Sequence, residues 1–158
     1  MHFLRSIQLD PSDRQVFGLA AAPGEWAVPG SFALLDIDPQ TCNQKQREAF
    51  HHGFIGTDSF GYASLVTVAD ISPADLSAVI EKIATHLRRH CGAPDDNAAR
   101  SAAEEEVGFT LEIAGHPPGT LIALRRELVD DGIEERYRIV SPAQGVDHGQ
   151  VHLWAVER

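Results

Sequence analysis

Three arginines near one predicted turn are the residues whose type and spacing point most directly to chemistry. Arg125, Arg136 and Arg138 lie on two strand-like segments that flank Asp131-Gly132, and an Asp-Gly pair is a strong signal for a two-residue hairpin loop. That register places Arg125 opposite Arg138. Like charges facing each other across a ladder are unfavourable, and guanidinium groups bind carboxylates and phosphates through paired hydrogen bonds. The pattern predicts either a small-anion site or a solvated strand face neutralised by acidic neighbours or an acidic partner.

Two histidines on a predicted helix have a spacing that metal sites use. His86 and His90 are four residues apart, which puts both rings on one helix face, and Cys91 follows directly. A zinc site needs a third and usually a fourth ligand, and Leu87 stands where a metalloprotease carries its glutamate. Histidines near a helix C-terminus are also favoured electrostatically without a metal. The pair is therefore a runner-up site for metal binding or enzyme chemistry, and we expect no cofactor.

A proline-stiffened loop holds a further binding candidate. His116 precedes Pro117 and Pro118, between a predicted helix that ends near Gly115 and a strand that starts near Thr120. The two prolines restrict the backbone and would hold the histidine in a defined place. Binding residues often lie in such loops, although the same loop could simply redirect the chain. His116 joins the three arginines as a candidate ligand-binding residue.

Motifs for nucleophilic or phosphate chemistry are absent from the sequence. Residues 56–61 come near the Gly-x-Ser-x-Gly pattern, but one residue too many precedes Ser59. The phosphate-binding and dinucleotide-binding glycine loops are missing, and Glu48-x-x-His51 is a single copy of a motif that di-iron sites need twice. We therefore assign no catalytic residue and favour a non-catalytic protein, although missing motifs alone do not exclude an enzyme.

The bulk composition limits the class of protein. The chain has 158 residues, a net charge of −10, 43% hydrophobic residues and 23% charged residues, which is typical of one globular domain over residues 1–158. The acidic balance argues against nucleic acid and anionic membranes as partners. No apolar run approaches the roughly 18 residues of a membrane span, and no signal peptide is predicted. Cys42 and Cys91 indicate no disulfide framework, so we expect a soluble cytoplasmic domain.

Turn and cap chemistry predicts the elements that position these residues. Strands are expected over residues 3–9, 14–19, 25–28, 31–36, 60–68, 121–128, 133–140 and 150–157. Three helices are expected to begin at Asp38-Pro39, Ser72-Pro73 and Asp95-Asp96. The predicted hairpin should turn Ile122, Leu124, Tyr137 and Ile139 toward the core. The fold class is therefore α+β, with a mostly antiparallel twisted sheet of about five to seven strands and three helices packed on it.

Two blocks of the sequence, residues 9–32 and 116–123, resemble an uncharacterised family, a domain of unknown function found in small alphaproteobacterial proteins. The resemblance spans most of the chain. It implies no activity and transfers no catalytic residue, and its association with lipoate-ligase-like and molybdoenzyme accessory genes implies an accessory role.

The leading functional hypothesis is a non-catalytic accessory or protein-binding domain. It would meet a protein partner, or a second copy in a homo-oligomer, through a sheet face or the proline loop. Two alternatives remain open: a metal-binding protein or small enzyme that uses His86 and His90, and a small-anion binder at Arg125, Arg136 and Arg138.

Overall fold

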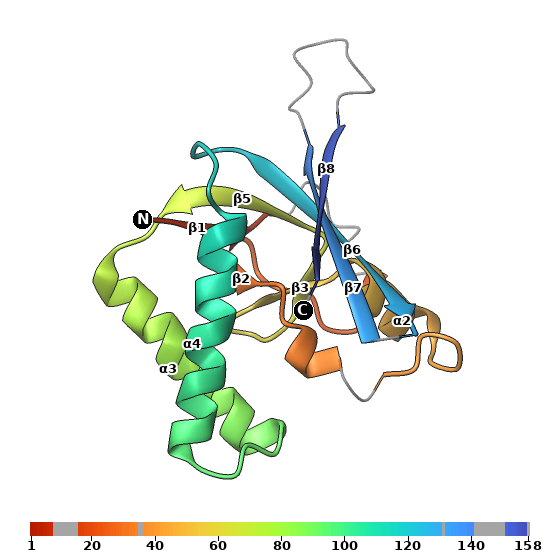
Figure 1. The fold of residues 1–158 in the computed structure, drawn as a ribbon, viewed down its shortest axis with the longest axis horizontal. Coiled ribbons are helices and arrows are strands. Elements are labelled where there is room, and N and C mark those ends of the chain that lie inside the picture. The colour runs from red at the N-terminus through yellow and green to blue at the C-terminus, as the bar shows by residue number, and fades with distance from the viewer. Residues whose placement is uncertain (8–15, 35–36, 131, 141–150, 158) are drawn as a thin grey trace.

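A curled antiparallel sheet organises the protein in the computed structural model, which describes residues 1–7, 16–34, 37–130, 132–140 and 151–157, the last range by its backbone alone. Its order is β4-β3-β2-β1-β5-β6-β7-β8 (Figure 1). The strands are β1 (His2–Ser6), β2 (Trp26–Val28), β3 (Phe54–Gly56), β4 (Tyr62–Ala63), β5 (Leu65–Asp70), β6 (Leu121–Val129), β7 (Gly132–Val140) and β8 (Val151–Glu157). All neighbouring strands are antiparallel.

Among the described residues, three α-helices and one short 3-10 helix accompany the sheet: η1 (Ser31–Leu34), α2 (Gln44–His52), α3 (Pro73–His90) and α4 (Asp96–Ile113). In Figure 1, α3 and α4 lie together on one side of the molecule, whereas α2 lies beside the turn end of the β6–β7 hairpin. The predicted α+β class, its antiparallel sheet and its three helices are confirmed. In the described part of the chain, none of these helices has the length and apolar character needed to cross a membrane.

The caps of the two long helices are those that the sequence predicts. The Ser72 hydroxyl accepts a hydrogen bond from the Asp75 N–H at 3.1 Å, and the Asp95 carboxylate accepts one from the Ala98 N–H at 2.8 Å. Each bond satisfies a backbone donor that has no partner within the first turn of its helix. These caps fix where α3 begins, and therefore where its histidine-bearing last turns lie.

Other predicted boundaries are wrong, for local reasons. The first helix does not begin at Asp38-Pro39, because Asn43 forms a capping box with Gln46 and starts α2 at Gln44. Residues 31–34 form η1 and not a strand: Gly30, at φ 72°, turns the chain, and its N–H donates to the Glu106 carboxylate at 2.8 Å. Residues 16–19 form no strand, and the rest of the two mispredicted strands lies outside the described residues.

The predicted hairpin register is also wrong, by two residues. Val129 pairs with Gly132, so Gly132 belongs to β7 and Arg125 faces Arg136, while Arg138 faces Ala123. A two-residue slip leaves every side chain on its predicted face, and Ile122, Leu124 and Tyr137 are indeed buried. The alternation of apolar residues in the sequence predicted the core face correctly, whereas the Asp-Gly turn signal predicted the wrong cross-strand partners.

The core lies on both sides of the central strand β1. Its neighbouring residues Phe3 and Leu4 are both 0% exposed, although side chains alternate between the two faces of a strand. Phe3 belongs to a cluster with Ile83 of α3 and Val107 of α4, whereas Leu4 belongs to one with Tyr137 of β7. The strand therefore contributes to both core clusters, and Ile113 at the end of α4 also belongs to the second one.

Candidate functional site

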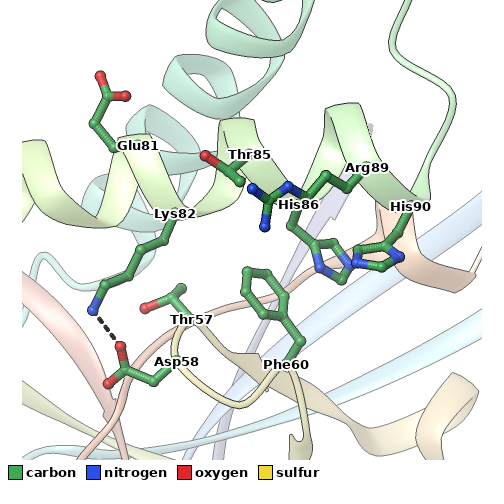
Figure 2. Close-up of a pocket in the computed structure, with 9 residues that line it drawn as sticks. All are labelled: Thr57, Asp58, Phe60, Glu81, Lys82, Thr85, His86, Arg89 and His90. Carbon is green, nitrogen blue, oxygen red and sulfur yellow. Dashed lines mark hydrogen bonds and ion pairs between the residues drawn. The ribbon is translucent and has the colours of Figure 1, made fainter.

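A surface cavity of about 400 Å³ lies between α3 and the loop that joins β3 to β4, and we call it the α3 pocket (Figure 2). It is lined by Thr57, Asp58, Phe60, Glu81, Lys82, Thr85, His86, Arg89 and His90. The cavity brings the predicted histidine pair together with a loop that the sequence singled out only for an imperfect serine motif. Its volume lies within the range of small-molecule sites.

A buried carboxylate shapes the loop wall of the α3 pocket. Glu25 is 6% exposed, and its two oxygens accept hydrogen bonds from the Asp58 N–H at 3.0 Å and from the N–H and hydroxyl of Ser59, both at 2.7 Å. They also accept one from the Ala22 N–H at 2.6 Å. A Cβ added to Gly56 would stand 2.5 Å from Glu25 Oε1, which explains the glycine there. Glu25 therefore holds the loop in one conformation.

Phe60 ends this loop in a conformation that bulky residues avoid. Its φ of 55° lies in the left-handed region, where contact between Cβ and the backbone costs about 1–2 kcal/mol. Its ring stacks on that of His86, with centroids 3.8 Å apart and planes 4° apart. A strained backbone at a pocket wall persists only where the surroundings impose it, and here the Glu25 hydrogen bonds do so.

The rings of the histidine pair and of Phe60 pack against one another. His86 lies against Phe60 on one side and 4.9 Å from the ring of His90. Burial, and then the proximity of His90, lower the pKa of His86 from its usual 6.5, so His86 is a neutral imidazole at pH 7. Within the described residues, no group of three or more His, Cys, Asp and Glu side chains is arranged to hold a metal ion.

Among the Lys, Arg, Asp and Glu side chains that line the α3 pocket, one cation has no ion pair with a described residue. Lys82 forms an ion pair with Asp58, and Glu81 forms one with Arg100 of α4. Arg89 is exposed and makes no ion pair with any residue that the structure describes. The pocket therefore offers a guanidinium group to an anion, in a chain whose net charge is −10.

The three predicted arginines share one exposed sheet face, which we call the arginine face (Arg125, Arg136 and Arg138). Arg125 pairs with Glu127 and Arg136 pairs with Glu134, each at 2.6 Å. The hydrogen bond from Arg125 is the main cause that lowers the pKa of Glu127. Arg138 has no ion pair within the described part of the chain. Two of the three guanidinium groups are thus already neutralised by strand neighbours.

His116 lies outside the α3 pocket. It stands in the turn after α4, where its N–H donates to the Ala114 carbonyl at 2.7 Å, and it is not among the residues that line the α3 pocket. The arginines lie further along the chain, within β6 and β7. The structure therefore does not place His116 in the α3 pocket, and its binding role stays a prediction.

Sequence reasoning missed a buried ion pair on the core-facing side of the same hairpin. Arg126 is 0% exposed, and its Nε lies 3.6 Å from Oε1 of Glu135, which stands directly opposite on β7. The hydroxyl of Tyr137 donates to the same carboxylate. In the predicted register Arg126 faced Tyr137, which hid the opposite-charge pair. With the correct register, the sequence alone would have indicated it.

Comparisons with known proteins identify a family, but that family has no assigned activity. No curated protein and no solved structure matches the chain. A family model described as a family of unknown function (DUF6505) matches residues 1–156, which agrees with the resemblance to an uncharacterised family noted from the sequence.

Proposed function

The chain belongs to this family of unknown function, and we propose that it is a non-catalytic binding domain for small anions, with the α3 pocket as its site. The observation that carries the proposal is Arg89, an exposed cation at the rim of a cavity whose other charges are matched in pairs. Guanidinium groups bind carboxylates and phosphates through paired hydrogen bonds. This proposal assigns the anion site to α3, whereas the sequence suggested the arginine face.

The stacked rings and hydrogen bonds of the pocket favour binding over catalysis. The Thr57 hydroxyl donates to the Trp26 carbonyl at 2.9 Å, and the Ser59 hydroxyl donates to Glu25. Neither hydroxyl is thus directed at a histidine that could activate it as a nucleophile. His86 is packed against Phe60 and His90 as part of the wall.

Thermal unfolding with acetate and phosphate as probes tests the proposal. A ligand at 100 times its dissociation constant adds about 2.7 kcal/mol of stability, so a bound anion should raise the Tm. We expect this rise for the wild type and for Arg138→Gln, the matched control on the arginine face, and a much smaller rise for Arg89→Gln.

The opposite pattern, with the rise lost in Arg138→Gln and kept in Arg89→Gln, would place the anion site on the arginine face and overturn the assignment to the α3 pocket. No rise in the wild type with either anion, up to high concentration, would overturn the proposal as a whole.

A second candidate function, self-association, is favoured by Arg138. This exposed residue faces the small Ala123 and has no ion pair within the described residues. The exposed carboxylates Glu105 and Glu112 lie on α4 of the same chain. A second copy could therefore present acidic α4 to the arginine face, since opposite charges steer and orient association.

Light scattering at two salt concentrations tests this second candidate. We expect a mean mass above that of the monomer at low ionic strength, which falls toward the monomer as salt screens the contact. Arg138→Gln should lower the mass at low salt, whereas Arg89→Gln should not. A monomer at every concentration and ionic strength would rule out self-association.

A further inference from the structure

The ring of Phe60 indicates which anions the α3 pocket would take. We infer that its ligand is a small aromatic acid, with a planar ring that stacks on Phe60 and a carboxylate that pairs with Arg89. This inference rests on the proposed function and names its ligand class. One face of the Phe60 ring is covered by His86, at 3.8 Å between centroids. In Figure 2 the ring lies between His86 and the side of the pocket that carries Thr57 and Lys82.

The ring is held in place before any ligand arrives. Glu25 fixes the preceding residues Asp58 and Ser59 through three hydrogen bonds, and the Phe60 N–H donates to the Gly56 carbonyl at 3.0 Å. An aromatic surface that is already ordered loses little conformational entropy on binding. The left-handed backbone of Phe60, at φ 55°, is a cost that a simple connecting loop could avoid with glycine. A role in stacking on a ligand ring explains why a phenylalanine, and not a glycine, occupies this strained position.

The charges of the pocket match a single carboxylate better than a polyanion. Lys82 is held by Asp58 and Glu81 by Arg100, while His86 is neutral near pH 7. Arg89 is then the one pocket cation without an ion pair in the described part of the chain. A cavity of about 400 Å³ has room for one ring and its acid group, at the lower end of the usual size range for ligand sites.

Three probes of similar size separate the two halves of the inference: benzoate, cyclohexanecarboxylate and benzyl alcohol. Their dissociation constants are measured by protein NMR titration at constant pH and ionic strength. Aromatic pairs gain a modest energy beyond apolar burial, so we expect benzoate to bind about two- to tenfold more tightly than cyclohexanecarboxylate. Benzyl alcohol keeps the ring but lacks the charge, and it should bind more weakly than benzoate.

Substitutions at Phe60 test whether the ring preference arises there. Phe60→Leu keeps an apolar side chain and should remove the preference for benzoate over cyclohexanecarboxylate, whereas Phe60→Tyr keeps the ring and should retain it. Arg89→Gln should weaken both acids and leave benzyl alcohol unchanged, and Arg138→Gln should change none of the three. Amide spectra of each free variant establish that it is folded.

The possible failures are distinguishable. Equal binding of benzoate and cyclohexanecarboxylate by the wild type would overturn the aromatic inference and leave the proposed anion site standing. Benzyl alcohol that binds as tightly as benzoate would overturn the acid part. If neither acid binds, and acetate and phosphate also leave the Tm unchanged, both the inference and the proposed function are wrong.

Discussion

Phe60 shows how much a single residue in the α3 pocket depends on its neighbours. Its left-handed φ of 55° is strained for any residue with a Cβ and free of strain for glycine. Phe60→Ala loses the stack on His86 and keeps the strain, whereas Phe60→Gly loses the stack and removes the strain. We expect the glycine variant to be more stable than the alanine variant by about 1 kcal/mol in urea unfolding. The reverse order would contradict the imposed conformation.

His86 should make the stability of the protein depend on pH. Burial and the proximity of His90 lower its pKa in the folded state below the usual 6.5, so the unfolded chain takes up this proton first as the pH falls. The contribution of His86 to stability is therefore complete above pH 6.5 and decreases as the pH falls through and below that value.

Urea unfolding at pH 7.5 and pH 5.5 measures this effect. The wild type should lose more stability between the two values than His86→Gln does, whatever the absolute stability of the variant. An NMR titration of the His86 ring gives an independent measurement, and its midpoint should lie below 6.5. An equal loss in both proteins, or a midpoint above 6.5, would contradict the half-buried neutral ring.

The sequence predicted individual residues of the α3 pocket without predicting the pocket. The spacing of His86 and His90 correctly places both rings on one side of α3. Glu25 carried no signal, because its partners Asp58 and Ser59 lie more than thirty residues further along the chain and are reached through their backbone N–H groups. Every residue except proline has a backbone N–H donor, so the sequence does not mark which donors a carboxylate will bind. A site that depends on backbone donors can be recognised only from the fold.

Helix α2 and strand β6 satisfy each other's backbone carbonyls through side-chain hydrogen bonds. The Arg126 guanidinium donates to the carbonyls of Phe50 and Gly53 at the end of α2, at 3.1 and 2.9 Å. These carbonyls form the negative end of the helix, which a cation stabilises. From the same helix, His51 and His52 donate through Nδ1 to the carbonyls of Arg126 and Leu124, at 2.8 and 3.1 Å.

The two histidines bind β6 carbonyls beyond the point where the pairing with β5 ends. The pairing of β5 with β6 ends at Leu65 and Ala123, so the following β6 carbonyls on that side need other donors. His51 and His52 supply them, so His51 of the Glu48-x-x-His51 motif has a structural role. The sequence could not reveal this, because it depends on where β5 ends.

Arg126 should be far more important for stability than its neighbour Arg125. Arg126→Met removes the cation from the α2 carbonyls and from buried Glu135, and breaking a buried pair costs about 3–5 kcal/mol. Arg125→Met removes an exposed ion pair with Glu127 and should cost at most about 1 kcal/mol. Urea unfolding of both variants provides the comparison, and similar losses would refute the capping role of Arg126.

At the scale of the whole molecule, the sequence predicts the elements better than their arrangement. Helix caps and core faces depend on neighbouring residues, so Ser72 and Asp95 mark helix starts correctly. Strand order depends on distant pairings: β1 lies between β2 and β5, and its Leu4 pairs with Val68. The three-residue strand β3 was missed because so short a segment shows no alternation. Tertiary packing, and not local pattern, selects these strands.

The central position of β1 predicts that the protein unfolds as one unit. Phe3 belongs to a core cluster with α3 and α4, and Leu4 belongs to one with the curled sheet and the C-terminal end of α4, so disrupting β1 weakens both. Leu4→Ala should cost about 2–5 kcal/mol and Phe3→Ala about 3–5 kcal/mol. In both variants and the wild type, circular dichroism and tryptophan fluorescence should give one coincident transition in urea. Separate transitions would mean that the helical layer and the curled sheet fold independently, and that β1 does not couple them.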